Sequence, residues 1–139
     1  MNYRRSGNTV VLRLDRGDEI MESLKRLADE CGITGGSFYA IGALGEGEIG
    51  VFDPEKKEYS LAHLKGDHEI DSLIGNISRM DGKSYVHAHI VVTDKDLKTT
   101  GGHLIKGTIS LTCEIFVNVL DEPVERRYDP NVGINVFDL

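Results

Sequence analysis

The stretch at residues 85–92 reads Tyr85-Val86-His87-Ala88-His89-Ile90-Val91-Val92. Its β-branched and aromatic residues are typical of a strand. Successive side chains of a strand alternate between its two faces, so His87 and His89 point to the same side. The sequence therefore predicts two imidazoles close together on one face of a β-sheet.

A third histidine, His103, follows a turn-rich gap and begins another strand-like run. A hairpin centred near Leu97 would pair His89 with Ile105 and leave His103 diagonally adjacent on the same face, where long side chains can meet. Zinc favours neutral imidazole ligands, and a catalytic zinc commonly takes three protein ligands and keeps one position open. We therefore predict a Zn²⁺ site formed by His87, His89 and His103. The alternative is that each ring packs in the core or faces solvent.

Residues on the same run could support such a site. Gly101 and Gly102 precede His103, and their missing side chains predict room for a ligand or another subunit to approach it. Glu114 lies further along the same strand-like run as His103 and is our candidate catalytic residue, either orienting an imidazole or acting as a general base through metal-bound water. Glu69 is a second candidate proton carrier. A paired surface carboxylate is an equally good interpretation of Glu114.

The composition is that of an ordinary globular protein. The chain has 139 residues, of which 40% are hydrophobic and 28% charged, so we predict one domain spanning residues 1–139. No apolar run approaches the roughly 20 residues that span a bilayer, and the first residues lack the apolar segment of a signal peptide. Cys31 and Cys113 lie far apart without metal-ligand spacing. These features predict a cytoplasmic protein with two reduced core cysteines.

The charge balance bears on partners. The chain carries 23 acidic against 16 basic residues, a net charge of −7. Nucleic-acid binding depends on Lys and Arg neutralising phosphates, so binding by this chain alone is disfavoured. Small basic groups remain, and we name them as candidate local patches: Arg4, Arg5, Arg13 and Arg16, and separately Arg126 and Arg127.

The remaining patterns predict an α+β fold built mainly on antiparallel sheet. Residues 9–14 form a first strand, and a helix follows that Asp15 or Asp18 caps and Gly32 ends. The helix carries one apolar stripe: Ile20, Met21, Leu24, Leu27, Ala28 and Cys31.

Glycines and turn residues punctuate the rest of the chain. The many glycines of residues 35–52 indicate close strand crossings more than a phosphate-binding loop, because neither GxGxxG nor GxxxxGK[ST] is present. A turn at residues 66–67 would leave His63 and His68 in solvent. Asp81-Gly82 predicts a tight hairpin that leads into the strand at 85–92.

The chain resembles the PPC (plants and prokaryotes conserved) domain family, in its form without AT-hooks. The resemblance covers nearly the whole length and is carried by these motifs: Ile41-Gly42-Ala43-Leu44, Gly75-Asn76-Ile77, His87-Ala88-His89, Gly101-Gly102-His103-Leu104, Glu114-Ile115, Arg127-Tyr128-Asp129-Pro130 and Gly133-Ile134-Asn135.

This resemblance implies a mostly antiparallel sheet flanked by helices, a homotrimer, and a metal, taken to be zinc, on the residues matching the three histidines. Plant members bind DNA through AT-hooks with the core Arg-Gly-Arg-Pro, which is absent here. We therefore consider three functions, and whether the protein is an enzyme stays open. The three candidates are a trimeric metalloprotein that acts on or senses a small molecule, a protein-assembly module, and a DNA-associated protein.

Overall fold

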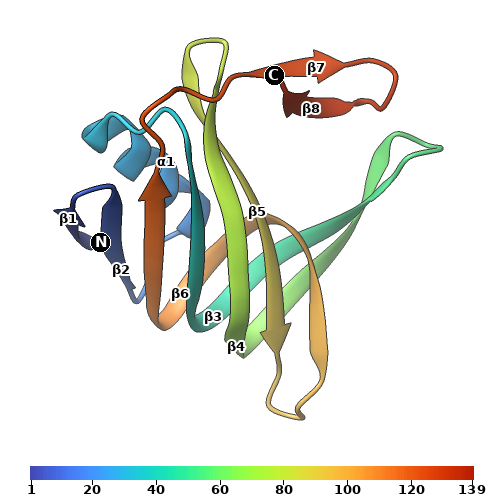
Figure 1. Cartoon of the computed structure of the whole chain (residues 1–139). Helices are drawn as coiled ribbons and strands as arrows, with labels where there is room; N and C mark the ends of the chain where they lie inside the picture. The colour runs from blue at the N-terminus through green and yellow to red at the C-terminus, as the bar shows by residue number, and fades with distance from the viewer.

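A long antiparallel sheet dominates the computed structural model, which describes all 139 residues and contains a single α-helix (Figure 1). The resemblance implied flanking helices, and the structure corrects this to one helix. No helix is both long and apolar enough to cross a membrane. The elements in chain order are β1 (Asn2–Ser6), β2 (Thr9–Asp15), α1 (Ile20–Cys31), β3 (Gly36–Asp53), β4 (Glu58–Met80), β5 (Lys83–Thr93), β6 (Thr99–Val119), β7 (Arg126–Asp129) and β8 (Ile134–Phe137).

The strand order of the main sheet is β1-β2-β6-β3-β4-β5, and β6 also pairs with β5. The long strand β6 makes this possible, because its first residues pair with β5 while its later part lies between β2 and β3. Strands β3, β4, β5 and β6 therefore close on themselves. Strands β7 and β8 form a separate two-stranded ribbon (Figure 1), which packs against β4 through Arg126.

The helix forms where its apolar stripe predicts, and its buried side chains are Ile20, Met21, Leu24, Leu27 and Ala28. The N-cap is Glu19, whose carboxylate accepts a hydrogen bond from the Glu22 amide at 2.7 Å. Our prediction of an aspartate cap was wrong, because the Asp18 carboxylate accepts from the Asp15 amide instead, at 2.9 Å. Gly32 ends the helix in the left-handed conformation with φ of +63°, as predicted.

The core lies between the helix and the inner face of the sheet. On β5, the residues that alternate with the histidines and continue that alternation turn inward, and these are Val86, Ala88, Ile90 and Val92. Cys113 is fully buried and Cys31 is partly buried, both as free thiols. Strand alternation therefore leaves His87 and His89 on the outer face, which the core does not use.

Two predictions about glycines had different outcomes. A Cβ at Gly42 would lie 2.4 Å from the Thr112 carbonyl oxygen, so close strand crossing is confirmed there. The turn at residues 66–67 was wrong. Strand β4 runs through Gly66, which has φ of +84°, and pairs with β3 on both sides of it.

The other histidines of β4 lie outside the site. The Nδ1 atom of exposed His63 lies 3.3 Å from a Glu48 carboxylate oxygen. His68 is half-buried, and its Nδ1 lies 2.7 Å from the Gly66 carbonyl oxygen.

Candidate metal centre

Three histidines converge on the outer face of β5 and β6. His89 is directly opposite His103 in the antiparallel pair, and His87 lies two residues before His89 on the same face. One ring nitrogen from each residue lies within 4.8 Å of the others. The ring centroids are 5.0 Å apart for His87 and His103, 5.2 Å for His87 and His89, and 5.5 Å for His89 and His103.

The register differs from our prediction by two residues. We expected His89 opposite Ile105, but Thr93 pairs with Thr99, which brings His103 opposite His89. The reason is a five-residue loop at 94–98. The Asp94 carboxylate closes this loop by accepting hydrogen bonds from two backbone amides, at 2.8 and 3.0 Å. The direct pairing brings the rings together more closely than the diagonal one would.

The site favours neutral imidazoles. Burial, and then the neighbouring charges of His103, Arg126 and His89, lower the pKa of His87 from 6.5 to about 4. Burial and His89 also lower the pKa of His103. A neutral imidazole has a free lone pair for a metal, so these residues are ready to ligate at neutral pH without first losing a proton.

The donor set fits zinc. Nδ1 of His103 is buried and makes no hydrogen bond, although a buried polar atom without a partner is costly. Zn–N bonds of about 2.0–2.1 Å place tetrahedral ligand atoms roughly 3.4 Å apart, a separation that side-chain rotation can reach from the one observed. Three imidazoles supply three ligands, and the fourth position stays open.

The side chain of Tyr59, near the start of β4, packs against the site. The Tyr59 ring lies 5.3 Å from the His103 ring, centroid to centroid. It can do so because Gly50 has no side chain: a Cβ there would lie 2.9 Å from the Tyr59 ring. The sequence analysis missed Tyr59, because its approach to His103 depends on the pairing of β4 with β3 and of β3 with β6.

The glycines before His103 serve the sheet. A Cβ at Gly102 would lie 2.8 Å from the Gly50 carbonyl oxygen, and one at Gly101 would lie 2.6 Å from the Ile90 carbonyl oxygen. Our prediction that these glycines make room for a ligand or subunit is therefore corrected. They allow the neighbouring strands to approach β6 closely, which fixes the position of His103.

A second missed group borders His87. Asn76 on β4 is directly opposite His87, and Ser78 is opposite Tyr85. The guanidinium of Arg126 donates to the Asn76 side-chain oxygen and to the Ser78 hydroxyl, both at 2.9 Å. We had grouped Arg126 with Arg127 as a basic patch, but Arg126 is only 9% exposed. Alternation along β7 turns Arg126 inward and leaves Arg127 in solvent.

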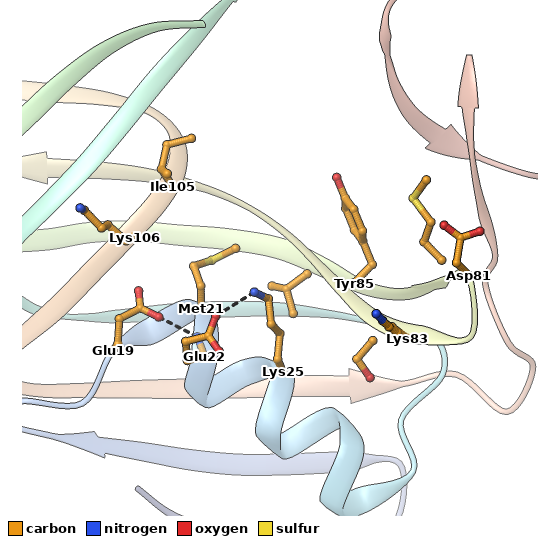
Figure 2. A pocket seen from close by; sticks show the side chains of 12 residues that line it. Glu19, Met21, Glu22, Lys25, Asp81, Lys83, Tyr85, Ile105 and Lys106 are labelled. Carbon is orange, nitrogen blue, oxygen red and sulfur yellow. Dashed lines mark hydrogen bonds and ion pairs between the residues drawn. The ribbon is translucent and has the colours of Figure 1, made fainter. Parts of the chain in front are cut away.

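A small hollow with a volume of about 390 Å³ lies beside His87 and His89. It is lined by Ser37, Phe38, Ile74, Gly75, Asn76, His87 and His89. Another hollow, of about 690 Å³, lies between α1 and strands β4 to β6 and includes none of the three histidines (Figure 2). Its charged groups, among them Lys25 and Glu22, are partly paired with one another.

The carboxylates that we named as proton carriers lie away from the histidines. Glu114 is eleven residues after His103 on β6 and pairs across the sheet with Arg13 and Ile41. It lines a separate hollow together with Glu69. The structure brings the three histidines together but does not bring Glu114 or Glu69 to them. A place on the same strand was insufficient, because eleven residues of β6 separate the two positions.

The fold and the site define a small antiparallel sheet protein with a three-histidine centre on its outer face. The model of the Plants and Prokaryotes Conserved (PCC) domain matches residues 1–121. The chain therefore belongs to this family, as the sequence motifs predicted. No curated protein is significantly similar in sequence.

Solved structures agree with this assignment over almost the whole chain. A proposed DNA-binding protein from Bacteroides thetaiotaomicron is 34% identical, with a TM-score of 0.95 over 99% of this chain and 96% of that one. A plant- and prokaryote-conserved protein from Pyrococcus horikoshii is 34% identical, with a TM-score of 0.88 over 99% and 94%. A metal-containing protein from Archaeoglobus fulgidus is 34% identical, with a TM-score of 0.87 over 99% and 98%.

Proposed function

We propose that this protein is a zinc-binding homotrimer that acts on or senses a small molecule at the open position of its metal. The convergence of three imidazoles, one of them with a buried unpartnered nitrogen, carries the proposal. The similar protein described as metal-containing supports it. When bound, zinc supplies a positive charge that lowers the pKa of bound water or polarises a substrate oxygen.

The residues of this chain have separate roles in that proposal. His87, His89 and His103 hold the ion, and Tyr59 packs against His103 and limits the movement of its ring. The hollow beside the histidines admits a small ligand. Neither Glu114 nor Glu69 lies among its lining residues, so neither of these two carboxylates is placed to act as its general base.

The outer face of the sheet supports self-association. A row of paired residues crosses it from Val11 to Phe116, Tyr39, Ile74 and finally His89. The four apolar members are between 39% and 55% exposed, and the Tyr39 and Phe116 rings stack with centroids 5.4 Å apart. Contiguous exposed apolar side chains of this kind mark interaction surfaces. A second copy of the chain on this face would cover the edge of the histidine hollow.

Elemental analysis of the purified protein, combined with its mass in solution, tests the proposal. We expect one zinc per chain and the mass of a trimer. Tyr39→Asp should dissociate the trimer, because it places a charge in the centre of the apolar row, whereas Tyr128→Asp on the separate β7–β8 ribbon should not. Protein without stoichiometric metal, or an unchanged mass for Tyr39→Asp, would contradict the proposal.

DNA association is the second candidate, favoured by the description of the Bacteroides thetaiotaomicron protein. Two of the basic residues that we named as candidate patches are not free to contact phosphate. Arg13 is paired with Asp15 at 3.0 Å, and Arg126 is buried. With a net charge of −7, we expect only weak duplex binding near physiological salt. Tight, sequence-selective binding in a gel-shift assay at that salt would reverse the order of the two candidates.

A further inference from the structure

Arg126 is a buried cation without an acidic partner. Its guanidinium donates to the Ser78 hydroxyl, to the Asn76 side-chain oxygen and to the Asn135 carbonyl oxygen, at 2.8–2.9 Å. It also lies over the rings of Tyr85 and Phe137, 4.8 and 4.4 Å from their centroids. Every one of these partners is uncharged. A buried charge is normally paired, so this one leaves a positive field that the protein itself does not neutralise.

That field reaches the metal site. Arg126 is hydrogen-bonded to Asn76, which is directly opposite His87 across strands β4 and β5. None of the seven residues that line the hollow is acidic. Three neutral imidazoles also leave a divalent metal its full charge. The hollow therefore combines two sources of positive charge with no negative side chain on its lining.

Arg126 fixes the orientation of the Asn76 amide. A guanidinium only donates hydrogen bonds, so the oxygen of Asn76 must face it and the NH₂ group must face the other way. Arg126 lies on the side of the Ser78–Tyr85 pair, and the next pair on the opposite side is Ile74 and His89. The Nδ2 atom makes no hydrogen bond within the chain, and Asn76 is one of the residues that line the histidine hollow.

A second donor is available on the neighbouring strand. Ser37 is opposite Asn76 across β3 and β4, so it shares the same outer face. Its side chain is exposed, and it lines the same hollow. Asn76 and Ser37 therefore present an amide N–H and a hydroxyl toward the space beside the metal ligands, where an acceptor group would satisfy both.

We propose that this hollow binds a small oxyanion, the carboxylate or phosphate group of the ligand, beside the open metal position. The Asn76 NH₂ group and the Ser37 hydroxyl donate to that oxyanion. Arg126 is a positioning residue: it does not touch the ligand but holds the Asn76 amide in the donating orientation. The inference rests on the proposed metal-binding function and adds the chemical class of the ligand to it.

Cobalt-substituted protein tests this inference, because the visible absorption of Co²⁺ reports on its ligands without any activity assay. Wild-type protein loaded with one Co²⁺ per chain is titrated with acetate and, separately, with inorganic phosphate. We expect a saturable spectral change with at least one of them. A response to acetate alone identifies a carboxylate ligand, and a response to phosphate alone identifies a phosphorylated one.

Asn76→Asp is the main variant, since its carboxylate can still accept from Arg126 but replaces the donor by a negative charge. A hydrogen bond to a charged group, once lost, weakens binding by about tenfold to a hundredfold, and we expect at least that for the anion. Asn118→Asp is the matched control, because Asn118 is opposite Ser37 on the same face, one strand further from the histidines. It should bind the anion within about twofold of wild type.

Arg126→Lys separates positioning from a purely structural role. It keeps the charge but loses the forked geometry that orients Asn76, so anion binding should weaken several-fold while cobalt stoichiometry stays at one per chain. Arg127→Lys, at the exposed neighbouring residue, should change neither. If the wild type takes up no cobalt, the metal-binding function itself fails. If it takes up cobalt but responds to neither anion, or if Asn76→Asp binds anions as well as the wild type, only this inference is overturned.

Discussion

Two hollows on the outer face of the sheet contain titratable side chains, and they differ in every other respect. The histidine hollow has no acidic group on its lining, and two of its lining residues, His87 and His89, cluster with His103, whose Nδ1 is buried and unpartnered. The other hollow, of about 520 Å³, is lined by Glu69, Asp71 and Glu114. Glu69 and Glu114 are exposed to solvent, and Asp71 already accepts a hydrogen bond from Thr93 at 2.6 Å. A buried, unpartnered imidazole nitrogen next to two further imidazoles therefore marks a ligand site better than the number of ionisable groups does.

The largest difference between the two hollows should be seen in zinc affinity. His103→Ala removes one of three ligands, so affinity should fall by more than the roughly 10- to 100-fold that the loss of a supporting residue costs. Glu114→Gln should leave the affinity unchanged, and so should His63→Ala, which removes a histidine outside the cluster. Competition with a chromophoric chelator measures all three. Equal affinities for His103→Ala and the wild type would remove the basis of the comparison.

Zinc should stabilise the protein through the histidine hollow only. Free zinc at a hundredfold excess over its dissociation constant raises the free energy of unfolding by about 2.7 kcal/mol if it binds only the folded chain. Thermal unfolding with zinc, and again after chelation, measures this increment. A variant with both Glu69→Gln and Glu114→Gln should keep the whole increment, whereas His87→Ala should lose it. If the two glutamate substitutions removed the increment instead, zinc would bind in the hollow that Glu69 and Glu114 line.

Glycine substitutions near each hollow should distinguish effects on the free energy of unfolding from effects on zinc binding. A methyl group at Gly102 would meet the Gly50 carbonyl oxygen at 2.8 Å, and one at Gly42 would meet the Thr112 carbonyl oxygen at 2.4 Å. Each change to Ala should cost about 1–3 kcal/mol or more, because backbone must move. Only Gly102→Ala should also weaken zinc binding, since it displaces His103. Urea unfolding and zinc titration of both variants give the two numbers.

The smallest effect that we predict is a pH dependence of the metal-free protein. The pKa of His87 is lowered from 6.5 to about 4 on folding, so the unfolded chain binds more protons between these values. The free energy of unfolding should therefore fall as the pH decreases from 6.5 toward 4, and the lowered pKa of His103 acts in the same direction. His87→Gln should reduce this slope, measured by chemical unfolding at several pH values. His63→Gln should not reduce it.

Part of the site could be predicted from local sequence. The side-chain period of a strand places His87 and His89 on one face whatever the strand pairs with. The Asp81-Gly82 turn also determines which residue of β4 is opposite His87. A two-residue hairpin fixes the register of its strands, so Met80 pairs with Lys83 and Asn76 is opposite His87. The only information needed is the length of that turn.

Other parts required the folded chain. The five-residue loop at 94–98 permits more than one register, and hydrogen bonds to Asp94 selected the one that faces His89 with His103. Leu111 continues the apolar alternation of β6, yet it is 69% exposed, because the pairing of β3 with β6 shifts between Gly42 and Leu44. A bulge of this kind depends on the partner strand and is not visible in the alternation itself.

For this protein, then, the order of residues alone determined the sheet-rich fold class, the single amphipathic helix, the family and the identity of the three imidazoles. These follow from short-range periodicity, turn chemistry and motifs. Only the tertiary structure decided that His103 lies opposite His89, that Arg126 is buried beside Asn76, and that Glu114 is remote from the three histidines. The physical reason is that burial and contact between distant segments depend on how whole strands pack, and no local pattern encodes that packing.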